Sequence, residues 1–288
     1  METTELLKRV RRIEIKTRGL TQQIFAGEYH SAFKGKGMAF SEVREYQYGD
    51  DIRNIDWNVT ARFNHPFIKT YEEERELTVM LLIDVSGSRD FASNTRLKKD
   101  LITEISAVLA FSAISNNDKI GVILFSDKVE KFIPPKKGIQ HILRIIRELI
   151  YFEPQNRETY ISGALEYLIN AIKKRSTAFI ISDFMDEGFE DALKIGSRKH
   201  DLIALRVYDQ RETELPDVGM ISMKDAETGK QVWVDSSFRS VREHYSRYWQ
   251  EKTTNIHEIL KKSGIDYAEI ATHEDYVKPL MQLFKKRA

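Results

Sequence analysis

The sequence predicts an α/β fold with a doubly wound, mostly parallel sheet, a small N-terminal subdomain and a C-terminal extension made of a hairpin and a helix. Residues 77–83 form a short, continuous apolar run, which is typical of a strand buried on both faces. From there to residue 207, apolar runs alternate with helical patterns. This alternation is typical of βαβ units, whose right-handed crossovers place helices on both faces of a sheet.

The elements after the first apolar run follow in regular order. Helices are expected at 99–115, 138–151, 161–174 and 188–199, and strands at 120–125, 129–133, 177–182 and 202–207. We expect 129–133 to be an edge strand that stops at Pro134 and Pro135, because proline donates no ladder hydrogen bond. The C-terminal part is expected to contain a hairpin at 219–235 turning at 227–229, a helix at 238–263, a strand at 265–272 and a helix at 275–286.

These elements divide the chain into three predicted parts. Residues 1–75 hold an N-terminal helix and a charged, aromatic segment, residues 76–209 form the main α/β domain, and residues 210–288 form an extension packed on that domain. Apolar residues at helical spacing within 3–16 alternate with basic ones and predict a short amphipathic helix. Docking of this helix on its own protein is favoured over a membrane-surface role, because its apolar face is small.

Composition excludes several classes of function. The 288 residues carry a net charge of +1, which argues against a nucleic-acid binder that relies on bulk charge. The absence of cysteine excludes disulfides, thiolate zinc sites and a cysteine nucleophile. No secretory signal precedes the first domain and no apolar run is long enough to span a bilayer. We therefore expect a cytoplasmic protein that meets membranes only through partners, if at all.

The segment before the first buried strand is unusually rich in interleaved acids, arginines and aromatic rings. Its glycine-containing start, residues 24–37, matches neither a Walker A loop nor a dinucleotide-binding loop, and residues 67–71 alternate as a strand leading toward the central strand. Arginine binds carboxylates bidentately and stacks on rings, so the segment is either a clasp onto the main domain, which is favoured, or a recognition surface for a partner. The residues proposed for these contacts are Arg44, Tyr46, Asp50, Asp51, Arg53, Asp56, Trp57 and Arg62.

Oxygen-bearing side chains follow the first buried strand. Asp84, Ser86 and Ser88 alternate with apolar or small residues, so on an extended segment they point to the same side. One carboxylate and two hydroxyls are ligands suited to a hard cation, Mg²⁺ above all, with Mn²⁺ or Ca²⁺ as alternatives. The competing interpretation is an ordinary strand-to-helix turn in which Ser and Asp cap the next helix.

Two later loops decide between these interpretations. Asp183 ends the apolar strand 177–182, and Thr159 precedes the helix at 161. If the strands 78–83 and 177–182 are neighbours, Asp183 lies beside Asp84 at the carboxyl edge of the sheet, where α/β folds place their sites. The complete predicted metal site is Asp84, Ser86, Ser88, Thr159 and Asp183, with one position left for a carboxylate from a partner. Asp186 is expected to cap the helix at 188 instead of binding metal.

Several stretches together resemble the bacterial family called domain of unknown function fifty-eight, which contains a von Willebrand A-like domain. The stretches are Arg44–Arg53, Ile55–Arg62, Leu81–Ser88, Thr159–Leu165, Ile181–Phe184 and Asp225–Gly229. The resemblance implies a metal-ion-dependent adhesion site at the five residues named above. It also implies a role beside a MoxR-type AAA+ ATPase in the assembly or maturation of client proteins. Many members carry two N-terminal membrane helices, which this sequence does not show.

Three functions follow from these observations. The first is a metal-dependent protein-interaction module, not an enzyme, that acts as an adaptor or co-chaperone between a MoxR-type ATPase and a client supplying an acidic residue to Mg²⁺. The second is a Mg²⁺-dependent hydrolase acting on a phosphate. It is disfavoured because the histidines are scattered and Ser86 stands where an aspartyl-phosphate enzyme would need a second Asp. The third is a membrane-surface adaptor that uses residues 3–16 and the basic tail 285–287.

Overall fold

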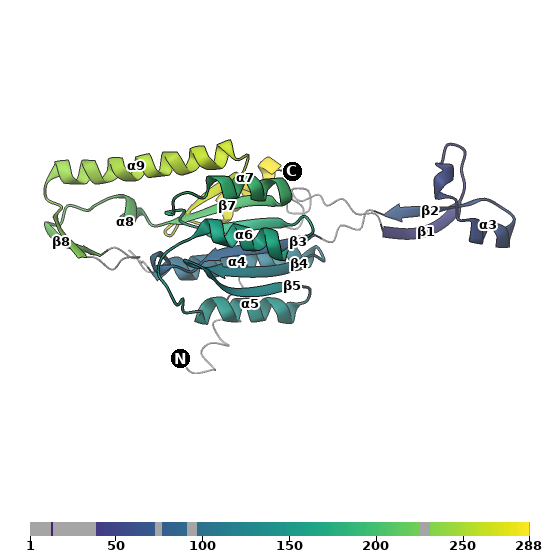
Figure 1. Ribbon diagram of the computed structural model, residues 1–288, viewed down its shortest axis with the longest axis horizontal. Helices are drawn as coiled ribbons and strands as arrows, with labels where there is room; N and C mark the ends of the chain where they lie inside the picture. Colours follow the sequence, from purple (N-terminus) through teal and green to yellow (C-terminus); the bar gives the residue numbers. More distant parts are fainter. Residues whose placement is uncertain (1–12, 14–38, 73–76, 91–96, 225–230, 288) are drawn as a thin grey trace. The chain divides into compact units, whose positions relative to one another are not determined.

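The computed structural model describes residue 13 and residues 39–72, 77–90, 97–224 and 231–287. The chain divides into two compact units, one formed by Lys34–Leu77 and the other containing Thr78–Ala288. The larger unit holds the central sheet and the candidate site, and Figure 1 shows its elements along the chain.

The central sheet of the larger unit has six strands in the order β10-β7-β6-β3-β4-β5. Five of them run parallel, and β5 is antiparallel to β4 at one edge. The strands are β3 (Thr78–Asp84), β4 (Lys119–Phe125), β5 (Val129–Lys136), β6 (Thr177–Ser182), β7 (Asp201–Tyr208) and β10 (Asp266–Ala271). This arrangement confirms the predicted doubly wound, mostly parallel fold.

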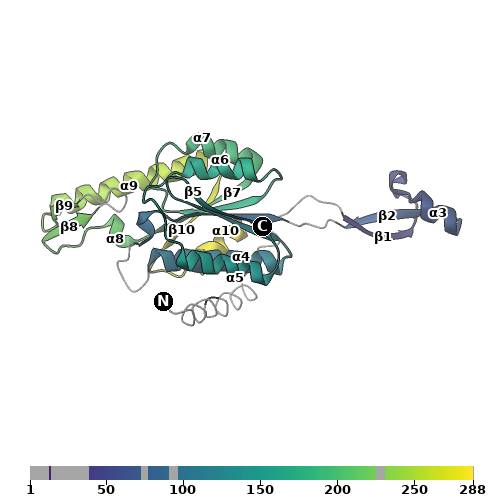
Figure 2. The same ribbon diagram turned by 60° about the horizontal axis from the view of Figure 1, so that its bottom comes forward.

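Helices cover both faces of this sheet (Figure 2). One face carries α6 (Ile161–Ala171), α7 (Glu190–Lys199) and α9 (Arg239–Lys262), and the other carries α4 (Lys98–Ser115), α5 (Ile139–Tyr151) and α10 (Val277–Arg287). Alternate side chains of each strand serve the two faces: Ala178 and Ile180 pack beneath α6, whereas Phe179 meets Phe284 of α10. Because β3, β6 and β7 are buried on both faces, their sequences are apolar almost throughout.

Strand β5 is longer than predicted, because it continues through both prolines to Lys136. The ladder shifts register between Ile120 and Val122, and Gly121 lies at this irregularity. A Cβ at Gly121 would stand 2.9 Å from the nitrogen of Pro135. An edge position and a bulge are the places where a sheet accepts proline, so the prolines did not end the strand.

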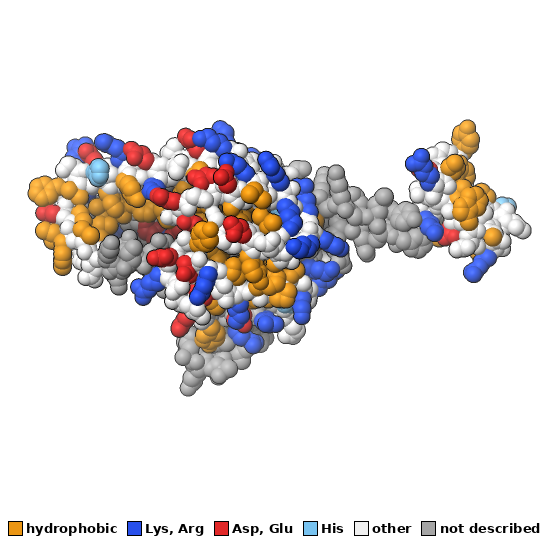
Figure 3. Space-filling view, viewed as in Figure 1, with side chains coloured by type: hydrophobic (Ala, Val, Ile, Leu, Met, Phe, Trp, Pro, Cys, Tyr) orange, Lys and Arg blue, Asp and Glu red, His pale blue; other side chains and the backbone are white. Residues whose placement is uncertain are grey.

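The C-terminal extension begins with the four-residue helix α8 (Gln210–Thr213), followed by the hairpin of β8 (Met220–Lys224) and β9 (Gln231–Asp235). The tip of the predicted hairpin lies outside the described residues. Apolar side chains gather on the surface of the hairpin, and Trp233 is 70% exposed (Figure 3). The long helix α9 then leads to the edge strand β10.

The smaller unit pairs β1 (Ala39–Glu45) with β2 (Phe67–Glu72) in an antiparallel ribbon. Between them lie a 3₁₀ turn at Ile52–Asn54 and the helix α3 (Trp57–Phe63). The strand predicted at 67–71 is therefore present, but it pairs with β1, which the sequence did not suggest. The predicted helix at 3–16, apart from Ile13, and the glycine loop at 24–37 lie outside the described residues.

Candidate metal centre

The carboxyl ends of β3 and β6 bring two of the predicted ligands together. The two strands are parallel neighbours, with Ile83 paired to Ile181, so Asp84 and Asp183 emerge at the same edge of the sheet. Ser182 donates its hydroxyl to Asp84 Oδ2 at 2.6 Å, directly across the strand pair. The neighbour relationship that the sequence analysis required is therefore confirmed.

Asp84 is buried and its carboxylate is held from two sides. Its Oδ1 accepts a hydrogen bond from the backbone N–H of Ser86 at 2.9 Å, while its Oδ2 accepts the Ser182 hydroxyl. Burial, followed by the nearby charge of Asp183, raises the pKa of Asp84 to about 6. A cation placed beside Asp84 would stabilise the ionised carboxylate, which burial and Asp183 make unfavourable.

The hydroxyls of the Asp84 loop lie beside each other. Ser86 is buried, and its Oγ lies 3.2 Å from the Oγ of half-buried Ser88. The loop that carries Thr159 reaches the same place, because Gly87 donates its backbone N–H to the carbonyl of Arg157 at 2.9 Å. The structure thus brings Asp84, Ser86, Ser88 and Asp183 into one cluster and ties the Thr159 loop to it through the backbone.

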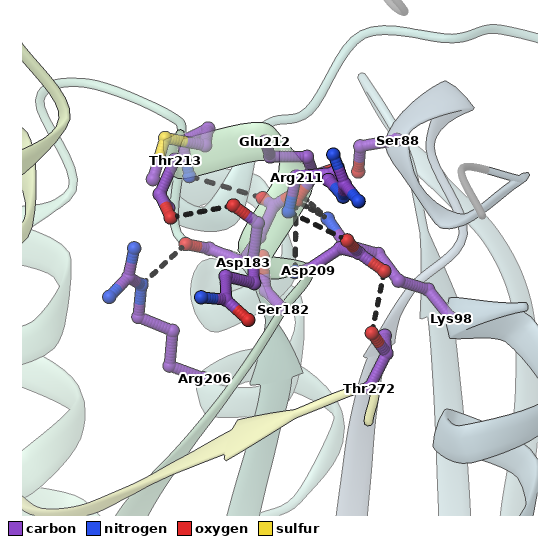
Figure 4. A network of polar contacts seen from close by, with 12 residues as sticks. Ser88, Lys98, Ser182, Asp183, Arg206, Asp209, Arg211, Glu212, Thr213 and Thr272 are labelled. Atoms are coloured by element: carbon purple, nitrogen blue, oxygen red, sulfur yellow. Dashed lines mark hydrogen bonds and ion pairs between the residues drawn. The ribbon is translucent and has the colours of Figure 1, made fainter. Parts of the chain in front are cut away.

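Lys98, which is not among the residues predicted for the site, also lies in this cluster. Its Nζ is 3.2 Å from Asp183 Oδ2 and 2.6 Å from Glu212 Oε2, and its side chain is only 2% exposed (Figure 4). Burial opposes the charge of this lysine, but Asp183 and Glu212 outweigh burial and raise the pKa of Lys98. Burial also raises the pKa of Glu212, against the influence of Lys98.

The chemistry of these residues fits a hard divalent cation. Among the described residues, no three carboxylate, histidine or cysteine side chains form a metal-binding group by themselves, so a cation would depend on the serine hydroxyls as well. The formal charge of these groups is −2, because the single ammonium of Lys98 faces the three carboxylates of Asp84, Asp183 and Glu212. Oxygen donors with that charge suit Mg²⁺ or Mn²⁺ and disfavour soft metals.

Asp186 does not cap the helix that follows it, and that prediction was wrong. Its Oδ2 accepts the backbone N–H of Ile161 at 2.7 Å, so it caps α6, which lies on the same face of the sheet. Helix α7 begins only at Glu190, with Phe189 at its N-cap position and no side-chain cap. Local sequence order suggested the nearer helix, whereas the packing of the two loops brought a different helix end to Asp186.

Some of the charged residues of the smaller unit make contacts within that unit. Arg44 binds Asp50 bidentately at 2.8 and 2.9 Å, and the hydrogen bond from Arg44 lowers the pKa of Asp50. Asp51 and Asp56 cap the 3₁₀ turn and α3 respectively. Several others point to solvent: Arg53, Arg62 and Trp57 are exposed, while Tyr46 is half-buried. Whether these exposed side chains meet the main domain or a partner stays a prediction.

Two of the missed residues had signals in the sequence. Lys98 stands three and seven residues before Leu101 and Ile105, so it occupies the buried stripe of α4, where a lysine needs a partner. Glu212 follows Asp209 by three residues and completes a capping box at the start of α8. Their meeting at Asp183 depends on three elements far apart in the chain, which the sequence pattern does not reveal.

The basic tail at 285–287, which suggested a membrane-surface role, makes contacts within the protein. Within the basic tail, Arg287 binds Asp201 at 2.6 Å and Asp266 at 2.7 Å, which fastens α10 to the starts of β7 and β10. In the described parts of the chain, every helix is too short or too polar to cross a bilayer.

Comparison with proteins of known sequence gives relatives whose own roles are uncharacterised. The uncharacterised protein Rv1480 of Mycobacterium tuberculosis is 26% identical over 292 residues, which cover 100% of this chain and 91% of that protein. The uncharacterised protein YeaD of Bacillus subtilis is 21% identical over 178 residues, covering 62% of this chain and 42% of YeaD.

Solved structures share the fold at low sequence identity. BatB of Bacteroides thetaiotaomicron has a TM-score of 0.50 at 16% identity, covering 73% of this chain and 98% of that one. An aerotolerance-related membrane protein of Bacteroides fragilis gives 0.51 at 17%, with the same coverage.

The family model described as "Protein of unknown function DUF58" matches residues 42–255, which include most of the smaller unit's ribbon and the whole candidate site. This match covers more than half of the chain and shows that the chain belongs to the DUF58 family, and its six-stranded, mostly parallel sheet has the von Willebrand A-like fold expected for that family.

Proposed function

We propose that this protein is a metal-dependent protein-interaction module, in which Mg²⁺ at the carboxyl edge of the sheet receives an acidic side chain from a partner. The observation that carries the proposal is the convergence of Asp84, Ser86 and Ser88 with Asp183, between neighbouring strands. The carboxylates and hydroxyls named above would hold the cation. A bound Mg²⁺ supplies a Lewis-acidic position that a carboxylate can occupy.

The residues around the site favour binding over turnover. Asp84 is fixed by Ser182 and by the Ser86 backbone, and Asp183 is fixed by Lys98. A general base in this cluster would have to be Asp84 or Asp183, and each of these carboxylates is already oriented by hydrogen bonds from neighbouring residues. These contacts favour the adaptor role over the phosphate hydrolase.

We further propose that the partner is a MoxR-type AAA+ ATPase and that the complex assists client proteins during assembly or maturation. Support for this step comes from the family resemblance, since the site chemistry specifies an acidic ligand and no particular protein. The cytoplasmic location expected from the sequence stays a prediction.

The test is titration calorimetry with Mg²⁺ and Mn²⁺, followed by a pull-down of the MoxR-type ATPase of the same organism in Mg²⁺ or in EDTA. We expect metal binding by the wild type, its loss in Asp84→Ala, and retention of the ATPase only with metal and intact Asp84. Asp191→Ala is a matched control, because this aspartate is exposed on α7. Equal ATPase retention by wild type and Asp84→Ala would overturn the proposal.

A further inference from the structure

Lys98 occupies an unusual place for a lysine. It is the first residue of α4, and its side chain runs into the interior at the edge of the sheet. Its Nζ lies between Asp183, at the end of β6, and Glu212, on α8 (Figure 4). Three separate elements therefore meet through one ammonium group. Burying an ammonium is unfavourable unless carboxylates pair with it, and two do so here.

Glu212 is held firmly in position on its side of the lysine. Its Oε2 also accepts the backbone N–H of Asp209 at 3.2 Å, as part of the capping box of α8. Asp209 in turn accepts the hydroxyl of Thr272, which follows β10, at 2.6 Å. Lys98 can thus keep a fixed, short ion pair with Glu212 even if its contact with Asp183 is lost.

Asp183 is in a different situation, because it is also a member of the predicted metal site. Its contact with Lys98 is the longer of the two, 3.2 Å against 2.6 Å. A divalent cation held by Asp84 and the two serines would compete with the ammonium for this carboxylate. Two positive groups that share one buried carboxylate repel each other, and burial weakens the screening of that repulsion.

We propose that Lys98 is the residue that sets the affinity of the metal site, by acting as a built-in cation that competes with Mg²⁺ for Asp183. The inference rests on the proposed metal-dependent function. Without metal, Lys98 neutralises Asp183. With metal bound, Glu212 alone balances the charge of Lys98. The remaining repulsion between the ammonium group and the divalent cation keeps the affinity of the site for the cation low.

The competing explanation is that Lys98 only supports the fold by neutralising two buried carboxylates. Removal of the lysine separates the two explanations. As a competitor, Lys98 weakens metal binding, so its loss tightens binding. As a support, Lys98 holds Asp183 in place, so its loss weakens binding.

The experiment measures Mn²⁺ affinity by calorimetry on the full chain for wild type, Lys98→Met, Glu212→Gln and the double variant. Methionine keeps the length of the buried stem, and the double variant has the net charge of the wild type, which removes bulk charge as an explanation. We expect Lys98→Met and the double variant to bind Mn²⁺ at least about tenfold more tightly than the wild type, because a like charge next to the ion is gone. Glu212→Gln should bind less tightly, because Lys98 then pairs with Asp183 alone.

Folding is checked by far-UV circular dichroism and thermal melting. If Lys98→Met fails to fold with two unpaired carboxylates, the charge-balanced double variant carries the test by itself. Wild-type or weaker Mn²⁺ affinity in a folded double variant overturns the inference about Lys98 while leaving the metal site intact. Absence of Mn²⁺ binding in every protein, the wild type included, would overturn the metal site itself.

Discussion

Ser182 donates its hydroxyl to Asp84 Oδ2 at 2.6 Å, so the carboxylate at the centre of the candidate site is oriented by the neighbouring strand. The same Ser182 oxygen accepts the backbone N–H of Phe184 at 3.0 Å. Phe184 has a φ of 60°, in the left-handed region that a bulky residue seldom adopts. One serine therefore fixes both the Asp84 carboxylate and the turn that carries Asp183.

Replacing this serine should weaken both the fold and the site. We expect Ser182→Ala to lower the free energy of unfolding by about 1–3 kcal/mol, because it leaves buried hydrogen-bonding groups without a partner. Urea denaturation gives the stability, and Mn²⁺ calorimetry should show weaker binding.

Ser106→Ala is the control for that variant. Ser106 is also buried, but its hydroxyl has no hydrogen-bond partner among the described residues. Its removal should leave stability within about 1 kcal/mol of the wild type. Equal losses in the two variants would show that the Ser182 hydroxyl has no special role.

Asp186 provides a test of the helix cap that the structure revealed. We expect Asp186→Ala to destabilise the protein by about 1 kcal/mol, because the first turn of α6 loses the acceptor for Ile161 N–H. Asp186→Asn, which keeps a side-chain oxygen, should lose less. Denaturant midpoints measure both, and a full loss in the asparagine variant would contradict a capping role.

His200 should make stability depend on pH. The imidazole is completely buried, its Nδ1 lies 2.9 Å from Ser176 Oγ, and burial lowers its pKa to about 4. The unfolded chain, with an ordinary pKa near 6.5, takes up the proton first as the pH falls. The stability contributed by neutral His200 is therefore complete above pH 6.5 and is lost between about pH 6.5 and 4, by up to about 3 kcal/mol.

The comparison for His200 is His200→Asn, whose amide can replace Nδ1 beside Ser176. Unfolding curves at several pH values should give a difference between wild type and variant that shrinks as the pH falls from 6.5 to 4. Other titrating groups are common to both proteins and cancel. A difference that stays constant across this range would contradict the assignment.

Trp57 can decide between the two interpretations of the charged, aromatic segment. Its side chain is 70% exposed at the start of α3. If the exposed surface of this unit binds a partner, Trp57→Ala should change stability by no more than about 0.5 kcal/mol and should reduce ATPase retention in the pull-down. A loss of stability above about 1.5 kcal/mol would instead favour a clasp onto the main domain.

Sequence patterns predicted the larger unit well, because each buried strand has a local signature. Strand β6, for example, was expected at residues 177–182 and spans Thr177–Ser182. The wrong predictions concern places where a residue far away in the chain changes what the local sequence pattern would give. Strand β5 continues through its prolines because Gly121 has no side chain to collide with Pro135 and the ladder shifts register beside it. Asp186 served a helix that precedes it in the chain, because two loops pack together.

The sequence by itself determined the order of strands and helices and the residues that end β3 and β6, since burial on two faces demands apolar runs and polar ends. Those local features predicted Asp84, Ser86, Ser88 and Asp183 as ligands of one site on the condition that β3 and β6 are neighbours, which the structure confirms. Only the tertiary structure decided what else meets them. Lys98 and Glu212 arrive from elements more than a hundred residues apart, and their pairing depends on how the helices pack, which no local periodicity encodes.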